Sequence, residues 1–322
     1  MILKKIFASL ITFILIILFF SRVPVVISER LVEALWPIGH IVSFAFWAWL
    51  LLSFNAYIKS RGSKQQLFLL LLLTLIIGGG IELLQPFFSR SAQLGDLYSD
   101  LFGAFFAYLF FGNFNKNNNN FLIASRFLYI ILLLYLMFPA MQTVKDEFET
   151  RIDFPIIAKF DSSSELTRWK ADLPLSIVNS SELPVTRKSD TNLMKITFAA
   201  EKDSRAVLRF FAGNWQGYKQ IKFSFFNPNQ ELLKVRLIIT DQNYDKSTSE
   251  NHTSNQNDRF GKWLLIDPGW NEYFVDLTDI ENAPTERDMD LSNIAGVDFY
   301  MYKLKEPIIL YVDNIELISP LD

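Results

Sequence analysis

Several polar side chains interrupt the apolar segment 78–112, where they would be costly in a membrane. Glu82 and Gln85 are three residues apart and share one face of a predicted helix. Asp96 and Asp100 are four apart and share a face of the next helix. Such residues are expensive in hydrocarbon, so they normally face a helix bundle, a water-filled pocket or each other, and mark function by default. The spacing therefore predicts a compact polar site at one membrane surface.

Two further residues complete this predicted site. His40 lies near the start of an earlier apolar segment, and Arg90 lies in the short link between the two helices. His40 could act as an acid or base, with Glu82 or Asp96 as its partner or as a metal ligand. Alternatively, Arg90 could bind a phosphate bidentately. No nucleophile motif or metal-ligand spacing accompanies these residues, so binding, catalysis and a purely structural role all remain open.

Composition divides the 322-residue chain into two regimes. The first part consists of apolar segments with few charges, and the remainder alternates like a soluble β-rich domain. The net charge of -3, without a basic stripe, makes nucleic acid an unexpected partner. With no cysteine, disulfides and thiolate sites are excluded, and nothing indicates a nucleotide, flavin or haem cofactor. We predict a multi-domain protein: a transmembrane helical domain over 1–140, a linker over 141–154 and an outer β-domain over 155–322.

Five apolar segments approach the length of about 20 residues that a helix needs to cross a bilayer. The first follows Lys4 and Lys5 and lacks a small-residue cleavage site, so we expect an anchor rather than a signal peptide. Basic residues favour a cytoplasmic N-terminus. Five spans then place the polar site and everything after Pro139 on the outer side of the cytoplasmic membrane. The segments cover 6–20, 36–54, 67–87, 97–111 and 121–139.

The polar residues of the membrane half also carry a family resemblance. They are His40, Glu82, Gln85, Arg90, Asp96, Asp100 and Gly103. In this order the pattern resembles the VanZ-like family of small membrane proteins, over about residues 1–140. That family usually has Asn at the position of Asp100, and a second carboxylate near Asp96 requires a proton or a cation between them. The resemblance implies a cell-envelope protein, whose best-known relative is linked to low-level resistance to the glycopeptide teicoplanin, but it supplies no agreed activity.

The second half changes to short alternating segments separated by Asn, Asp, Gly and Pro. About nine such segments predict an antiparallel all-β sandwich or jelly roll. The predicted strands cover 156–160, 193–198, 206–211, 220–226, 233–240, 263–266, 272–277, 297–302 and 308–318.

Three stretches of this half resemble carbohydrate-binding modules with a galactose-binding-like jelly roll. They are FDSSSELTRW from 160, WQGYKQIKFSFFNPN from 215 and LYVDNIELI from 310. The resemblance covers most of 155–319 and implies sugar binding. Relatives often hold a structural calcium between the chain ends, which nominates Asp161 and Asp313. Calcium needs six or more oxygen ligands, so ordinary surface or turn carboxylates are the alternative.

Exposed aromatic rings would stack on the apolar faces of sugars in such a module. The candidates are Trp215, Tyr218, Trp263 and Trp270, with Tyr244 as a further aromatic and Asp241, Arg259 and Asn271 as polar partners. Trp215 and Trp270 each adjoin an Asn and have a Gly within two residues, which favours loop tips. Most aromatics in a sandwich belong to the core, so packing is the alternative for each. The polar segment 241–259 is either a binding loop or disorder.

The sequence leaves two functions and one structural alternative. In the first, the helical bundle of a non-catalytic envelope protein binds a lipid or lipid-linked glycan head group at the outer leaflet, and the outer domain binds an envelope polysaccharide. In the second, a membrane enzyme acts on lipid-phosphate or glycan substrates through His40, Glu82 and Asp96. In the structural alternative, the polar residues only hold the helices together.

Overall fold

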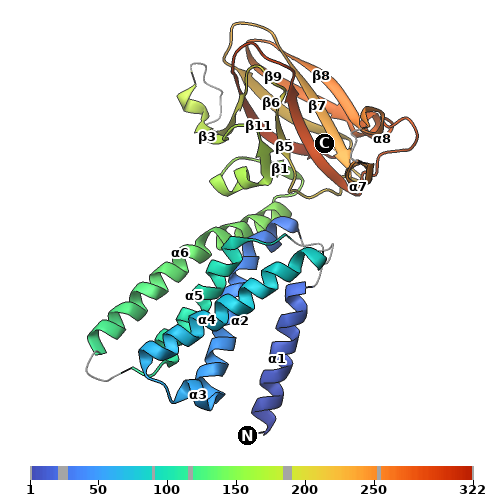
Figure 1. Cartoon of the computed structure of the whole chain (residues 1–322). Helices are drawn as coiled ribbons and strands as arrows, with labels where there is room; N and C mark the ends of the chain where they lie inside the picture. The colour runs from blue at the N-terminus through green and yellow to red at the C-terminus, as the bar shows by residue number, and fades with distance from the viewer. Residues whose placement is uncertain are drawn as a thin grey trace. The chain divides into compact units, whose positions relative to one another are not determined.

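The structure, a computed structural model, describes residues 2–20, 28–88, 91–114, 119–183, 191–251 and 255–320. The chain divides into two compact units, Met1–Val144 and Lys145–Asp322. Figure 1 shows that the first unit is built from helices and the second mainly from strands.

The longer helices of unit 1 overlap the predicted apolar segments, and one short additional helix lies between the second and third segments (Figure 1). They are α1 (Ile2–Phe20), α2 (Glu29–Phe54), α3 (Ala56–Lys59), α4 (Ser63–Leu84), the 3-10 helix η1 (Gln85–Phe88), α5 (Leu94–Phe111) and α6 (Asn119–Ile152). Among the described residues, four helical segments are long and apolar enough to cross a membrane: α2, α4 with η1, α5 and α6. In α1 the apolar stretch Leu10–Phe20 is shorter. Length and composition are therefore compatible with membrane insertion.

Helices α2 and α5 pack closely because α5 carries a glycine at the contact. A Cβ on Gly103 would collide with the carbonyl oxygen of Ile41 on α2. The neighbouring Ala104 and Ala107 are fully buried, and such small residues let helix backbones approach. Ser28 caps the start of α2 by accepting a hydrogen bond from the backbone N–H of Leu31. The face of α5 that carries Gly103 consequently lies against α2.

Helix α6 continues through most of the segment 141–154 that was predicted as a linker. Several good helix formers lie in this stretch, among them Lys145, Glu147 and Arg151, and ion pairs one turn apart support it. Lys145 lies 3.3 Å from Glu149, and Arg151 lies 3.7 Å from Glu147. The two compact units meet within this helix, between Val144 and Lys145.

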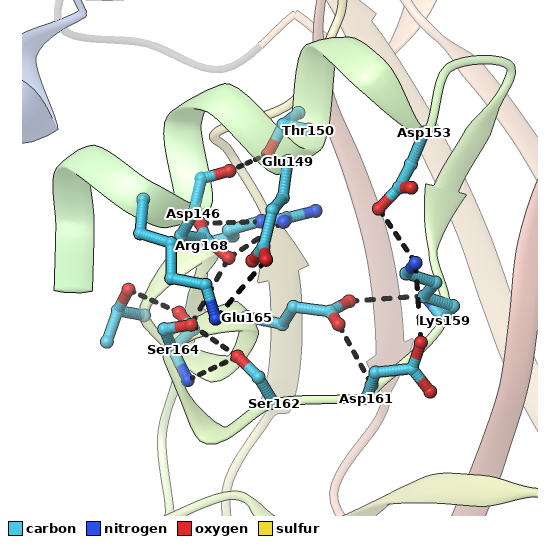
Figure 2. Close-up of polar contacts among 12 residues, drawn as sticks. Asp146, Glu149, Thr150, Asp153, Lys159, Asp161, Ser162, Ser164, Glu165 and Arg168 are labelled. Carbon is cyan, nitrogen blue, oxygen red and sulfur yellow. Dashed lines mark hydrogen bonds and ion pairs between the residues drawn. The ribbon is translucent and has the colours of Figure 1, made fainter.

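A buried ion pair joins the last turns of α6 to the beginning of the β-domain (Figure 2). Arg168 ends the 3-10 helix η3 (Ser163–Arg168) and donates Nε and Nη2 to the two carboxylate oxygens of Asp146, at 2.8 and 2.7 Å. Its Nη1 donates to the carbonyl of Ile157 at 3.2 Å. Beside it, Glu165 accepts consecutive backbone N–H groups, those of Lys159, Phe160 and Asp161. The buried charges of Arg168 and Asp146 are thus paired with each other.

Unit 2 contains the predicted antiparallel sandwich. Its strands are β1 (Ile156–Ala158), β2 (Trp169–Ala171), β3 (Ser176–Asn179), β4 (Asn192–Phe198), β5 (Ser204–Leu208), β6 (Gln220–Asn227), β7 (Leu233–Asp241), β8 (Phe260–Ile266), β9 (Gly269–Asp276), β10 (Ile294–Met301) and β11 (Ile308–Ile318). One sheet has the order β3-β4-β11-β6-β9, with β1 also paired to β11, and the other has the order β2-β5-β10-β7-β8. Each of the nine predicted strands has a counterpart, and the structure adds β2 and β3.

Alternating side chains fill the space between the two sheets. On β10, Val297 and Phe299 are buried in the shared core. Asp298 and Tyr300, one residue further along in each case, lie on the opposite, outer face of the five-stranded sheet. Trp169 stacks on Phe299 with ring centroids 6.0 Å apart, so this tryptophan belongs to the core.

Part of the predicted loop 241–259 is the helix α7 (Gln242–Asn251), while residues 252–254 lie outside the described part of the chain. Asp241 accepts hydrogen bonds from Arg287 and from the backbone N–H groups of Tyr244 and Asp290. Burial acts to raise the pKa of Asp241, but these hydrogen bonds outweigh it and the pKa is lowered. A paired buried carboxylate therefore fixes the start of α7, so this portion is ordered.

Candidate functional site

Four of the predicted polar residues in unit 1 meet between α2, α4 and α5. His40, Glu82, Asp96 and Asp100 are only 1%, 8%, 3% and 1% exposed. One possible ligand atom from each of the first three lies within 4.8 Å of the others. We call these four residues the helical cluster. The close packing of α5 on α2 brings its members together from distant parts of the sequence.

The imidazole of His40 is oriented by a carboxylate. Nδ1 of His40 lies 2.7 Å from Oδ1 of Asp100, and the ring donates this hydrogen bond when the carboxylate is ionised. On the other side of the ring, Nε2 lies 3.5 Å from Oδ2 of Asp96 and has no hydrogen-bond partner among the described residues. That Asp96 oxygen accepts a hydrogen bond from Nε1 of Trp36 at 2.9 Å. The bond to Asp100 leaves the second ring nitrogen available beside Asp96.

Other atoms in and near the helical cluster also lack partners within the described part of the chain. Oε2 of Glu82 accepts the backbone N–H of Gln93 at 2.6 Å, but its buried Oε1 has no partner. The same is true of Oδ2 of Asp100 and of Nε2 of the buried Gln85. A Cβ on Gly78 would collide with that Asp100 oxygen, so the glycine makes room for the carboxylate. Each unsatisfied buried atom costs about 1–3 kcal/mol, and such a group calls for an explanation.

Arg90 lies outside the described residues, so its predicted contact with a phosphate stays a prediction. The helical cluster itself consists of three carboxylates and one imidazole. As described, it is suited to binding a cation, a proton or hydroxyl groups, and an anionic head group would need a compensating positive charge.

The predicted sugar-binding aromatics do not form one surface. Trp215 is fully buried, so its ring offers no face to a sugar. The Asn and Gly residues near Trp215 predicted a loop. The segment is irregular, but its tryptophan packs into the core. Tyr218 is partly buried and packs edge-on against Phe154. Trp270 is partly buried against Phe226, with ring centroids 5.2 Å apart. Packing therefore accounts for these three residues.

Trp263 is different, because its side chain is 51% exposed. It lies on the outer face of the five-stranded sheet, and strand pairing places it in a row across four strands. The guanidinium carbon of Arg236 lies 5.7 Å from the centre of the Trp263 ring. The row consists of Trp263 on β8, Arg236 on β7, Tyr300 on β10 and Arg205 on β5.

The adjacent row of this face has a carboxylate at its centre. Asp298 on β10 pairs with Val207 on one side and Ile238 on the other, and Ile238 pairs with Gly261. A Cβ on Gly261 would lie 3.0 Å from Nη2 of Arg236, so the glycine leaves room for that guanidinium. We call the charged and aromatic residues of this surface the arginine face. Its members are Arg205, Arg236, Arg259, Trp263, Asp298 and Tyr300.

Asp298 is buried at the centre of the arginine face. Burial raises the pKa of its carboxyl to about 6, against the lowering effect of Arg205, Arg209 and Arg259. Nη1 of Arg205 lies 3.9 Å from one carboxylate oxygen of Asp298, and no described residue bonds the other oxygen. The buried Nε atoms of Arg236 and Arg259 also lack partners. Unused donors and an unused acceptor thus lie on the same face as an exposed aromatic ring.

Sequence reasoning named Trp263 and Arg259 but missed the other four members of this face. Arg205, Arg236 and Tyr300 look like ordinary outward positions of alternating strands. One signal was available: Asp298 interrupts the otherwise apolar stretch of β10. An acidic residue there has to face solvent, a partner or a ligand.

The two residues predicted to hold calcium lie in different surroundings. The Asp161 side chain is 60% exposed, 3.3 Å from Nζ of Lys159. Lys159 also bonds Asp153, and this hydrogen bond raises the pKa of Lys159. Asp313 is buried on β11. Within the described residues, three possible metal ligands come together in the helical cluster and not at Asp161 or Asp313. Calcium binding by the β-domain stays a prediction.

No family model matches the chain, and no curated protein matches it. The resemblance to the VanZ-like family therefore rests on the quoted residues alone. Among solved structures, the C-terminal half is similar to a family 11 carbohydrate-binding module from Clostridium thermocellum in complex with a β-1,3-1,4-mixed-linked tetrasaccharide. This similarity has 16% identity and a TM-score of 0.37, and covers 51% of this chain and 94% of that one.

An exo-β-agarase is also similar, with 14% identity and a TM-score of 0.40, over 51% of this chain and 24% of the agarase. Similarities at these TM-scores carry no argument about a ligand. The description of unit 2 as a sandwich rests on its own strand pairing.

Proposed function

We propose that this chain is a membrane-anchored protein of the cell envelope whose β-sandwich binds carbohydrate on the arginine face. One observation carries the proposal: the exposed ring of Trp263 shares the outer face of the five-stranded sheet with buried polar atoms of Asp298, Arg236 and Arg259 that lack partners among the described residues. An aromatic ring can cover the apolar face of a sugar. Sites of this kind combine such a surface with a few well-placed polar groups that fix orientation.

The chemistry of the face suits hydroxyl groups. A sugar hydroxyl both donates and accepts, so it can donate to Asp298 and accept from a guanidinium at the same time. Arg209 is already paired with Asp245 at 2.8 Å. The arginine face itself carries three guanidinium groups and one carboxylate, so its net charge favours a glycan with acidic substituents.

The full-length protein in detergent, applied to a glycan array, tests this proposal. We expect selective binding by the wild type, and at least tenfold weaker binding by Trp263→Ala, a loss of about 1.4 kcal/mol. The matched control is Phe274→Ala, which removes a 49%-exposed aromatic of the other sheet that also has a cation near its ring, Lys222. Binding to no glycan, or equal binding by Trp263→Ala, would contradict the proposal.

We propose for unit 1 that its helices anchor the chain in the cytoplasmic membrane, with the N-terminus inside and the β-domain outside. Four apolar helical segments support anchoring. Because the chain has no cysteine, a single introduced one can report its side of the membrane. In intact expressing cells, a membrane-impermeant thiol reagent should label the exposed position of Lys202→Cys. It should label Ser60→Cys, between α3 and α4, only after permeabilisation. The reverse pattern would overturn the orientation.

We further propose that the helical cluster binds a lipid or lipid-linked glycan head group. The unpartnered atoms of His40, Glu82 and Asp100 support a ligand that supplies hydrogen bonds. The test is retention of lipids by the purified protein, measured by mass spectrometry after exchange into defined vesicles. Glu82→Gln should release a lipid species that the wild type retains, and identical lipid profiles would contradict this role.

One observation favours catalysis as a second candidate function. The Asp100 carboxylate orients His40, as an orienting group does for a general base. Beside Glu82 and Asp96, His40 would accept a proton from an attacking water molecule. The water oxygen would bond to the phosphorus of a lipid-phosphate or the anomeric carbon of a glycan as the bond to the leaving alcohol oxygen breaks, and that alcohol would take up a proton. Turnover of lipid-linked phosphates by the wild type, lost in His40→Gln, would support this function. Binding without turnover would leave the binding protein as the better description.

A further inference from the structure

We propose that the helical cluster binds one divalent transition-metal ion through Nε2 of His40 and one carboxylate oxygen each of Glu82 and Asp96. Asp100 acts as the residue that orients His40. A metal ion at this position is compatible with either lipid binding or catalysis by the helical bundle.

The geometry brings three ligands from three helices around one point. His40 comes from α2, Glu82 from α4 and Asp96 from α5, with possible ligand atoms within 4.8 Å of one another. Ligands bound to a metal at about 2.0–2.2 Å lie roughly 3–4 Å apart. Small rotations of buried side chains are enough to close this difference, and all three residues are already buried.

The imidazole has the arrangement of a metal-bound histidine. Such a histidine almost always donates its second ring N–H to a carboxylate, a backbone carbonyl or water. Here Nδ1 of His40 bonds Asp100 at 2.7 Å, and Nε2 is buried without a hydrogen-bond partner. The lone pair of Nε2 is therefore available on the side of Asp96.

The two carboxylates are also held in place by other groups. One oxygen of Glu82 accepts the backbone N–H of Gln93 at 2.6 Å, while its other oxygen is buried without a partner. Asp96 accepts a hydrogen bond from Trp36 at 2.9 Å. Each proposed ligand is thus oriented by a neighbour that is not itself a ligand, as expected of a prepared site.

Charge and ligand type indicate which ion fits. Three carboxylates close together in a buried site repel one another, and a divalent cation offsets that repulsion. An imidazole ligand suits Zn²⁺ and similar transition metals, whereas Mg²⁺ and Ca²⁺ prefer oxygen ligands alone. Three protein ligands leave at least one coordination position open to a water or a ligand. We therefore expect Zn²⁺ to bind more tightly than Mn²⁺, which shares the preference of Mg²⁺ for oxygen ligands.

The experiment uses the full chain in detergent, stripped with a chelator, dialysed against Zn²⁺ or Mn²⁺ and analysed for metal by mass spectrometry. We expect about one ion per chain and a melting temperature that rises with metal concentration. Asp100→Asn keeps all three ligands and should weaken affinity about 10- to 100-fold. Glu82→Gln should lose the ion. Glu33→Gln, which removes the same charge from an exposed position of α2, should retain it.

Co²⁺ gives a second readout that does not depend on stability. Its visible absorption should report a site of low coordination number in the wild type and in Glu33→Gln, and should be lost in Glu82→Gln. A folded wild type that retains far less than one ion per chain would overturn the proposal. Full metal retention by both Glu82→Gln and Asp96→Asn would do so as well. If those variants fail to fold, unchanged affinity in Asp100→Asn decides against it.

Discussion

The helical cluster and the arginine face both contain buried polar atoms without partners, but they differ in enclosure and charge. The helical cluster is closed in by three helices and is rich in carboxylates. The arginine face lies across four strands, is rich in guanidinium groups and has the open ring of Trp263 at its edge. An enclosed acidic site suits one small cation, whereas an open basic face can take several units of an extended chain.

Paired and unpaired buried polar groups also differ in how they affect the stability of the protein. Where a buried charge is fully paired, removing one partner leaves the other unpaired and destabilises the protein. Where a buried polar atom lacks a partner, removing its charge should stabilise the protein while weakening ligand binding, as at many functional sites. The two kinds of buried charge can therefore be distinguished by the sign of one measurement.

The largest expected effect is at Arg168. Its buried charge is fully paired, so it serves as the reference for the unpaired groups. Arg168→Ala leaves the carboxylate of Asp146 buried without its bidentate partner, so we expect the free energy of unfolding to fall by about 3–5 kcal/mol. Denaturant unfolding of the full chain in detergent, followed by tryptophan fluorescence, measures this. A loss below about 1 kcal/mol is typical of an exposed ion pair and would contradict the description of Arg168 and Asp146 as a strongly coupled buried pair.

The opposite sign is expected at Asp298, in the arginine face. Its folded-state pKa of about 6 lies above the ordinary value of 3.8. Between about pH 4 and pH 6 the folded protein holds a proton that the unfolded chain releases, so the wild type loses stability as pH rises through this window. At about 1.4 kcal/mol per pKa unit, the cost at pH 7 is up to about 3 kcal/mol.

Asp298→Asn removes this titration. The variant should unfold at a higher temperature than the wild type at pH 7, the two should converge near pH 4, and the variant should bind glycan more weakly. Thermal melts across that pH range measure the difference. A variant that is less stable than the wild type at pH 7 would place Asp298 among the paired structural charges.

A smaller effect is expected in the helical cluster from its neighbouring glycines. Gly78→Ala places a methyl group against the Asp100 carboxylate, so the His40 hydrogen bond must shift at a cost of about 1–3 kcal/mol. Gly79→Ala is the matched control, because nothing lies within 4 Å of its Cβ. A helix gains up to about 1 kcal/mol from that change. Equal melting temperatures for the two variants would argue against a tightly enclosed cluster.

The smallest effect is expected at the surface of α6. Glu149→Gln removes an exposed pair with Lys145, and such pairs contribute about 0.3–0.5 kcal/mol. The melting temperature of this variant should be close to that of the wild type. The small difference tests whether the measurement resolves effects of this size. A large loss would mean that Glu149 supports the neighbouring buried pair.

The contrast explains what sequence reasoning could find. Carboxylates inside apolar segments are anomalous, so Glu82, Asp96 and Asp100 were identified, and helical spacing placed them on facing surfaces. Polar residues that alternate along a strand are ordinary, and only the strand order shows that Arg236 and Asp298 lie in adjacent strands. The arginine face therefore could not be predicted from single segments of the sequence.

Local signals failed where tertiary packing decided the outcome. Asn and Gly beside Trp215 correctly indicated an irregular segment, but the direction of its ring depends on which surface that segment covers. The charged end of α6 was predicted as a linker because its apolar pattern stops there. Strong helix formers and the buried Asp146 continue the helix. The core strands were predictable because their period of two is fixed by burial on one side.

The pairing of Asp146 with Arg168 sets where the chain can be divided. The hydropathy pattern places the border near residue 140 or 155. However, Asp146, which pairs with Arg168 of the β-domain, lies in the last turns of α6. A fragment that begins at residue 155 would carry a buried guanidinium without its carboxylate. Any transplant of the β-domain onto another anchor therefore has to take the end of the helix with it, starting no later than Lys145.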